Sequence, residues 1–352
     1  MTENKLDWNK INFPLTLAPM VGLSHVALRE LLHLYLPTEA ITLWPTEMLN
    51  SRRVPKEDLT RTPETLKLAT EKFLVPQILG NEEKPIFETI QKLKNWGAHG
   101  IDINMGCPVQ KALKHNYGVA LMGDRAYAAN VVRMAVKSSE LPVSVKLRAV
   151  ESANSVEDLY EFVKSLVDEG ASWITLHPRT AKQKRRGQAD WQQIKLLKSK
   201  FSIPIIGNGD IQNQSDILEM KKLTHCDLVM SGRALAARPW MFWQLGYQLG
   251  MTAPENDLIA GRTKPPLTRV EEGAEFGKSL LVFIELCRQY FGESLALRKI
   301  SFYIKTTSPW LEFGHTLFSI STRAKSIESL KILVNDFFTQ EQVMYSETDL
   351  RQ

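Results

Sequence analysis

Short apolar runs alternate with longer amphipathic segments between residues 15 and 233 of this chain. Between the runs, apolar residues such as Ile86, Ile90 and Leu93 recur three and four positions apart, which is typical of one face of a helix. Eight runs have the length and composition of buried strands, and they lie at 15–18, 40–44, 74–79, 100–104, 143–147, 173–177, 203–207 and 227–230. Eight strand-helix units in this length favour a closed (β/α)8 TIM barrel over an open, doubly wound sheet. No Gly-x-Gly-x-x-Gly follows the first strands, which also weakens a dinucleotide-binding open sheet.

The pattern changes after the last of these strands. Residues 251–267 are polar and interrupted by prolines, which is typical of a linker. Helical spacing of apolar residues returns at 270–291 and continues at 295–304 and 326–338. We therefore predict a catalytic TIM barrel over residues 1–250, a linker over 251–267 and a small all-helical C-terminal domain over 268–352.

Composition narrows the class of protein. The chain has 352 residues, of which 43% are hydrophobic, enough to bury a sizeable core. It carries a net charge of +5, which permits a polyanionic partner without requiring one. No apolar run is long enough for a bilayer and no signal-peptide pattern opens the chain, so a cytoplasmic protein without membrane contact is expected. The three cysteines are odd in number and widely spaced, at Cys107, Cys226 and Cys287, which argues against disulfides and a zinc site. We therefore expect no bound metal. We also expect the protein to be a monomer.

Polar residues and glycines follow the predicted strands. In a TIM barrel, the residues just past the carboxyl ends of the strands converge on one mouth. Those positions hold Pro19, Met20, Glu47, Gln77, Asn104, Cys107, Lys146, Arg148, His177, Arg179, Asn208, Gly209, Gly232 and Arg233. A purely structural barrel would not require so many polar groups there, so we predict a functional site at this mouth.

Two motifs at the mouth suit a phosphate group. Gly-Asn-Gly-Asp at 207–210 follows the seventh strand, and Ser-Gly-Arg at 231–233 follows the eighth. Glycines let backbone N–H groups approach an anion, and Arg233 can hold phosphate oxygens through two parallel hydrogen bonds. Either motif alone could be an ordinary turn, but their occurrence after strands seven and eight favours the phosphate site, with Asp210 beside it.

Three further side chains could contact a flavin or be merely structural. Lys146 stands in an otherwise apolar strand, where an ammonium is unfavourable unless it faces the mouth or an anion. Beside the N1–C2 edge of a flavin it would stabilise the reduced ring, although a lysine reaching solvent at the strand end is the alternative. His177 could equally be a buried core histidine, and Gln77 could bind a heterocycle edge or cap a turn.

Cys107 lies between Gly106 and Pro108. The glycine permits a sharp turn and the proline fixes its own φ, so the sulfur is expected to be displayed at the strand end. The alternative is a small buried side chain, the usual state of a free cysteine.

Together these motifs resemble the signature of the tRNA dihydrouridine synthases. The matching positions are Asn104-Met-Gly-Cys107-Pro followed by Lys111, Lys114 and Gly118, with Leu17-Ala-Pro-Met20, Val75-Pro-Gln77, Val145-Lys146-Leu-Arg148, His177-x-Arg179-Thr180, the two phosphate motifs, and Arg298-Lys299. They occur in order through the barrel and into the helical tail.

The resemblance implies FMN at the barrel mouth, NADPH as reductant, and reduction of the C5–C6 bond of specific uridines in tRNA. It implies cofactor contacts from Pro19, Met20, Gln77, Lys146, His177, Asn208, Gly209, Asp210, Gly232 and Arg233, with Cys107 as the general acid. It implies substrate or RNA contacts from Asn104, Lys111, Lys114, Arg148, Arg179, Arg298 and Lys299.

Two other functions stay open at this point. One is an FMN-dependent TIM-barrel reductase or dehydrogenase of a free pyrimidine such as dihydroorotate, which would not need a basic helical tail. The other is an RNA-binding or chaperone-like protein with a vestigial flavin site, which fits poorly with so complete a set of mouth residues.

Overall fold

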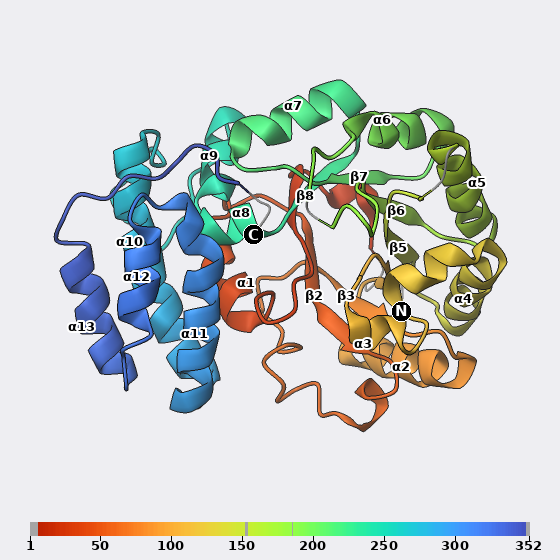
Figure 1. Cartoon of the computed structure of the whole chain (residues 1–352), viewed down its shortest axis with the longest axis horizontal. Coiled ribbons are helices and arrows are strands. Elements are labelled where there is room, and N and C mark those ends of the chain that lie inside the picture. The colour runs from red at the N-terminus through yellow and green to blue at the C-terminus, as the bar shows by residue number, and fades with distance from the viewer. Residues whose placement is uncertain (1–5, 152–153, 185, 350–352) are drawn as a thin grey trace.

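Parallel strands form a barrel surrounded by helices, and further helices pack on one side of it (Figure 1). This computed structural model describes residues 6–349 apart from 152, 153 and 185, and describes Lys111 by its backbone only. The strands are β1 (Leu15–Leu17), β2 (Leu43–Asn50), β3 (Phe73–Leu79), β4 (Ile101–Met105), β5 (Val143–Arg148), β6 (Trp173–His177), β7 (Ile205–Asn208) and β8 (Leu228–Ser231). The helices around the barrel are α1 (Val26–His33), α2 (Glu83–Trp96), α3 (Gln110–Leu113), α4 (Arg125–Ser138), α5 (Ser155–Asp168), α6 (Trp191–Lys200), α7 (Gln214–Thr224), α8 (Arg233–Ala237) and α9 (Met241–Gln248). The C-terminal helices are α10 (Arg269–Tyr290), α11 (Glu293–Thr307), α12 (Gly314–Ser321) and α13 (Ile327–Phe337).

The barrel is closed between its first two strands by side chains. Strands β2 to β8 pair in sequence and β8 pairs with β1, all in parallel. Across the remaining gap, Thr16 Oγ1 donates to the Leu43 carbonyl at 2.6 Å and Thr42 Oγ1 donates to the Leu15 carbonyl at 2.7 Å. The predicted TIM barrel followed by a helical region is confirmed.

For the second strand, the predicted residue range was largely wrong. We predicted it at 40–44, whereas β2 runs from Leu43 to Asn50. Its middle holds Thr46 and Glu47, and its register against β3 shifts between Pro45 and Met48. A proline, two polar side chains and a bulge remove the apolar pattern by which strands are recognised.

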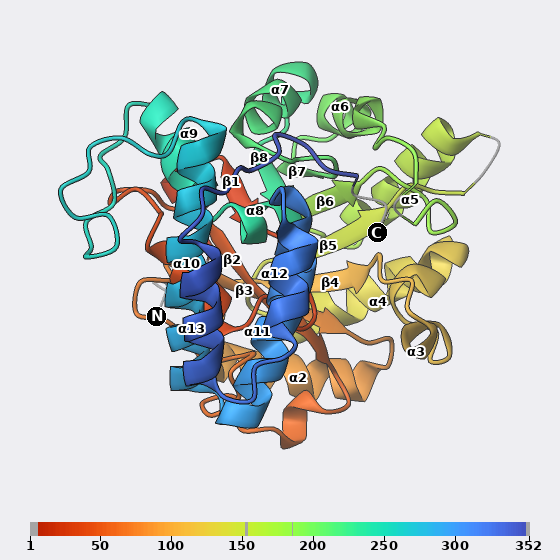
Figure 2. The same ribbon diagram turned by 60° about the vertical axis from the view of Figure 1, so that its left-hand side comes forward.

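The C-terminal helices share one apolar core with the barrel. Phe276, Leu280 and Phe283 of α10 belong to the same cluster of buried residues as Leu28 and Leu31 of α1. Figure 2 shows α10 beside α13 and α11 beside α12, and these pairs are in contact. The helical tail is therefore packed against the barrel.

The segment between α9 and α10 is irregular but also packed. Ile259 is buried, and Asn256 Nδ2 donates to the carbonyl of Leu34 at 2.7 Å. The domain boundaries at 250 and 268 stay a prediction. Among the helices of the described residues, none is both long and apolar enough to cross a bilayer.

Candidate active site

A cavity of about 220 Å³ opens at the carboxyl ends of β1 and β5 to β8. Its lining includes Pro19, Met20, Lys146, Arg148, His177, Arg179, Asn208, Gly209, Asp210, Gly232 and Arg233. Of the residues expected to contact a cofactor, only Gln77 lies outside this lining, on β3. The fold thus brings together the residues at the ends of β1 and β5 to β8. Four other residues predicted at the mouth lie outside this lining, namely Glu47, Gln77, Asn104 and Cys107.

Lys146 is held by an oriented amide. Its Nζ donates to Asn208 Oδ1 at 3.3 Å, and Asn208 Nδ2 donates to the carbonyl of Met230 at 2.7 Å. The second bond fixes which end of the amide faces the lysine. Burial, followed by the charge of Arg148, lowers the pKa of Lys146 to about 8. An anion placed here would therefore stabilise the ammonium form.

His177 is a neutral imidazole. Burial lowers its pKa to about 2, and the charges of Lys146 and three arginines act in the same direction. Its Nε2 lies 3.5 Å from Nη1 of Arg179, a donor, so Nε2 accepts and Nδ1 carries the proton. His177 can therefore donate one hydrogen bond inside a positively charged site.

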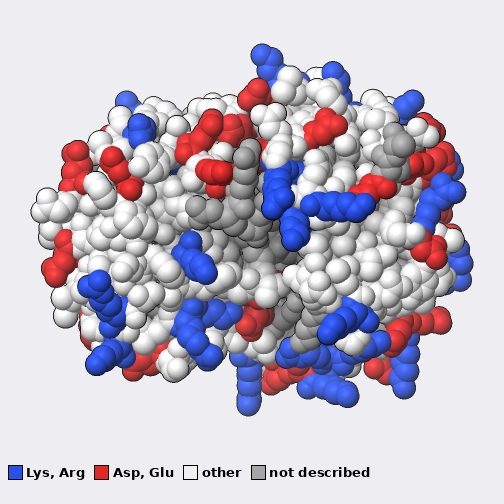
Figure 3. Space-filling model, viewed as in Figure 1, with Lys and Arg blue, Asp and Glu red and all other residues white. Residues whose placement is uncertain are grey.

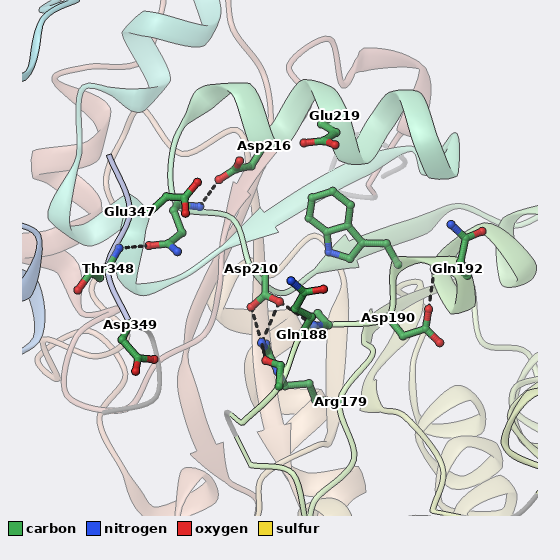
Figure 4. Close-up of a pocket in the computed structure, with 14 residues that line it drawn as sticks. Arg179, Gln188, Asp190, Gln192, Asp210, Asp216, Glu219, Glu347, Thr348 and Asp349 are labelled. Carbon is green, nitrogen blue, oxygen red and sulfur yellow. Dashed lines mark hydrogen bonds and ion pairs between the residues drawn. The ribbon is translucent and has the colours of Figure 1, made fainter. Parts of the chain in front are cut away.

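Arg179 and Asp210 form an ion pair in the wall of the mouth (Figure 4). Arg179 Nη2 lies 2.6 Å from Asp210 Oδ1, and Asp210 Oδ2 accepts from the backbone N–H of Ala189 at 2.6 Å. Arg179 is only 6% exposed. The pair locks Arg179 in place, and the carboxylate of Asp210 is directed to that arginine.

The loop that carries Cys107 is fixed from two sides. Asn104 Oδ1 accepts from the N–H groups of Gly106 and Cys107 at 3.1 and 2.9 Å. Arg148 Nε donates to the carbonyl of Gly106 at 2.8 Å. Gly118 has φ +60°, and a Cβ on it would lie 2.6 Å from the carbonyl oxygen of Cys107. The cysteine itself is partly exposed, so its position is set by neighbours while its side chain stays accessible.

Asp102 is a buried residue of this region that sequence reasoning missed. Its Oδ2 accepts from Gln77 Nε2 at 2.7 Å and its Oδ1 from Ser144 Oγ at 2.6 Å. Gln77 Oε1 in turn accepts from Asn104 Nδ2 at 2.7 Å. A chain of hydrogen bonds therefore joins the barrel interior to the Cys107 loop. Burial raises the pKa of Asp102. The period of two along β4 was the available signal, because it puts residues 102 and 104 on one face of the strand.

The residues expected to bind RNA have different environments. Lys114 and Arg298 are exposed, while the side chain of Lys111 lies outside the described part of the chain. Figure 3 shows Lys and Arg side chains around the hollow in the centre of one face. Among the described residues, no group of three or more His, Cys, Asp or Glu side chains is placed to hold a metal ion.

Lys299 does not fit the expected RNA-facing role. Its Nζ lies 3.3 Å from Glu64 Oε1 and 3.7 Å from Glu47 Oε1, and 5.3 Å from the ring centre of Phe291. Its side chain is 13% exposed. Lys299 instead ties α11 to the barrel, because its charge is held by two carboxylates of the barrel half.

Comparison with known proteins identifies the family. The family model for dihydrouridine synthases matches residues 16–290. The chain belongs to the dihydrouridine synthase family. A probable tRNA-dihydrouridine synthase of Mycobacterium tuberculosis is 31% identical over 337 residues, which cover 92% of this chain and 81% of that protein. One from Rhizobium leguminosarum bv. phaseoli is 32% identical over 244 residues, covering 69% and 74% of the two chains. The tRNA-dihydrouridine synthase B of Proteus vulgaris is 28% identical over 261 residues, covering 74% and 78%. The resemblance of the sequence motifs to this family is thereby confirmed.

Proposed function

We propose that this protein reduces the C5–C6 double bond of specific uridines in tRNA, with FMN bound at the barrel mouth and NADPH as the source of hydride. The observation that carries the proposal is a group of cations in a cavity at the strand ends, next to the loop of a partly exposed cysteine, in a member of this family. An RNA substrate is favoured over a free pyrimidine because exposed Arg298 and Lys305 lie on α11, a helix that packs beside the mouth.

The chemistry of the cavity lining suits an anionic cofactor. Among the described lining residues, the cations are Lys146, Arg148, Arg179 and Arg233, and the only carboxylate is Asp210, which is paired with Arg179. An excess of cations over carboxylates in this lining fits a phosphate group and a ring that gains negative charge on reduction. In the proposal, Asn208, Gly209, Gly232 and Arg233 hold the phosphate, with Pro19 and Met20 beside the ring.

Three side chains hold the cofactor ring in this proposal. Gln77 is oriented by Asp102, so one of its amide hydrogens is committed and its direction is set. Lys146 supplies positive charge, and neutral His177 supplies a hydrogen bond without adding charge. When bound, FMN supplies the hydride for C6 of the uracil.

Cys107 completes the reduction as the general acid. Hydride addition at C6 leaves negative charge toward C5, and a proton from the thiol to C5 completes the saturated bond. Asn104 and Arg148 hold the loop so that this proton is delivered from a fixed position. The uridine must leave its stack to reach a barrel mouth, which is easiest in the loops of tRNA.

The test compares two cysteine variants. Purified wild-type protein with FMN and NADPH is expected to form dihydrouridine in unmodified tRNA, measured by mass spectrometry of digested RNA. Cys107→Ala should keep the flavin and its reduction by NADPH but lose about 100-fold or more of the turnover, the usual contribution of a general acid. Cys226→Ala, at a buried cysteine that does not line the mouth cavity, should stay active. Undiminished turnover in Cys107→Ala would remove the acid role, and wild-type protein without FMN binding or dihydrouridine formation would overturn the function.

A further inference from the structure

A second cavity, of about 500 Å³, adjoins the candidate active site. One wall is the loop after β1, with Val21, and the other is α11, with Phe302 and Lys305. Pro19, Met20 and Arg233 line both this cavity and the one at the strand ends, so the two are neighbours at the mouth. Its volume lies in the range of about 300–1,000 Å³ that proteins use for small organic groups.

The walls of this cavity expose large apolar side chains. Val21 is 60% exposed and Phe302 is 44% exposed. The Phe302 ring lies against the backbone of Gly22, where a Cβ would come within 3.0 Å of Cε1 and where φ is +83°. The ring of Phe302 therefore packs against Gly22 along one edge and is partly exposed to solvent. A single exposed phenylalanine needs no explanation, but an aromatic and an aliphatic side chain exposed together beside an active site indicate a binding surface.

The same face of α11 is positively charged. Arg298 lies four residues before Phe302 and Lys305 three residues after it, so the three share one side of the helix. Both cations are exposed. An aromatic ring flanked by cations is the combination with which proteins bind single-stranded nucleic acid, because bases stack and phosphates are attracted.

A third cavity, beside α6 and α7, has the wrong charge for RNA. It measures about 680 Å³, and its lining includes Asp190, Asp210, Asp216, Glu219 and Glu347 (Figure 4). The C-terminal segment borders both cavities through Thr348 and Asp349. A polyanion that reaches the mouth is therefore repelled from the side of α6 and α7 and attracted toward α11.

We infer that Phe302 is the stacking surface for a base next to the uridine that is reduced. The inference rests on the proposed function. A uridine that enters the barrel leaves its stack, and its neighbour in the RNA then loses a stacking partner. The ring of Phe302 replaces that partner, while Arg298 and Lys305 face the phosphates on either side. Because every base has a π-face, this contact holds the RNA without selecting one base over another.

The experiment measures tRNA affinity in variants of full-length protein with bound flavin. Phe302→Ala should raise the dissociation constant for unmodified tRNA about 5- to 150-fold, the usual effect of losing one stacked base. Phe302→Leu keeps apolar contact with Gly22 but has no ring, so it should lose affinity in the same way, whereas Phe302→Tyr should bind like wild type. Phe87→Ala is the matched control, since Phe87 on α2 is 49% exposed and lies outside the mouth cavities.

A fluorescent base separates stacking from general affinity. Once the reduced uridine has been mapped, 2-aminopurine placed beside it should be quenched on binding to wild type and much less on binding to Phe302→Leu at saturating protein. Normal affinity and normal quenching in Phe302→Leu would overturn the inference while leaving the proposed function intact, provided that wild type forms dihydrouridine. Loss of affinity in Phe302→Tyr equal to that in Phe302→Leu would show a packing role and also overturn it. Wild-type protein that neither binds tRNA nor forms dihydrouridine would overturn both proposals.

Discussion

Burial, together with positive charge at the barrel mouth, sets the protonation of two of its residues. Lys146 and His177 lie partly buried beside arginines, and both have lowered pKa values, with burial as the main cause. The consequences differ because the values differ. His177 stays neutral at any physiological pH, whereas Lys146, with a pKa of about 8, changes charge just above neutrality.

The affinity for FMN should therefore depend on pH through Lys146. In the cofactor-free protein, Lys146 is mostly protonated below pH 8 and mostly neutral above it. A bound anion favours the protonated form of this side chain. Raising the pH from 7 to 9 reduces the protonated fraction about tenfold, so we expect the affinity to fall by about that factor. Fluorescence titration of cofactor-free protein with FMN at pH 7, 8 and 9 measures the effect.

Lys146→Met is the control for that titration. It should bind FMN more weakly than wild type at pH 7 and show little further change up to pH 9. A wild-type affinity that is constant from pH 7 to 9 would show that Lys146 does not titrate against the cofactor.

The location of residues at the strand ends was predictable because strands and helices alternate regularly along the barrel sequence. The carboxyl ends of parallel strands lie at one end of the barrel, so Lys146 and Asn208 were placed correctly from the sequence. The partners of a side chain are different, because they come from distant segments. The pairing of Arg179 with Asp210 and the link from Asp102 to Gln77 each require the register of neighbouring strands, which no single segment contains.

At the scale of one element, α11 gives two adjacent cations opposite roles. Successive residues on a helix point about 100° apart, so Arg298 faces solvent while Lys299 faces the barrel. The sequence motif Arg-Lys does not distinguish the two. The internal role of the lysine is shown by Glu64 and by Glu47, which lies on the part of β2 that lacks an apolar pattern.

Substitution of these two residues should separate stability from RNA binding. Lys299→Met leaves the buried carboxylate of Glu47 without its cation and should lower the free energy of unfolding by on the order of 3 kcal/mol. Arg298→Ala should leave stability almost unchanged, weaken tRNA binding and reduce the slope of log affinity against log salt by about 1. Denaturant melts and binding titrations at several salt concentrations measure both. If Lys299→Met kept wild-type stability but reduced the salt dependence of tRNA binding, Lys299 would contact RNA and would not tie α11 to the barrel.

At the scale of the whole molecule, the barrel and the tail are joined by buried polar contacts as well as apolar packing. Glu272 of α10 accepts from Trp240 Nε1 at 2.9 Å and Gln244 Nε2 at 3.0 Å, and it pairs with Arg238 at 3.4 Å. Glu275 accepts from the hydroxyl of Tyr35 on the barrel side at 2.7 Å. The proline-rich composition of 251–267 predicted a linker between two domains. Composition describes this connecting segment but does not show which groups pack across it.

The protein should consequently unfold as one unit. Both parts contain buried tryptophans, with Trp44 in the barrel and Trp310 in the tail, so fluorescence reports on each. Because the apolar core is continuous and the Arg238 side chain is only 1% exposed, unfolding the tail alone would uncover apolar surface and an unpaired charge. We expect a single denaturant transition with the same midpoint by tryptophan fluorescence and far-UV circular dichroism.

Two glutamine variants test this coupling. Glu272→Gln should lower the midpoint equally in both signals. Glu271→Gln is the control, because Glu271 belongs to the capping box of α10, where glutamine also serves, and this change should alter the midpoint little. Two separate wild-type transitions, with the tail unfolding first, would show that the barrel is stable without its helical partner.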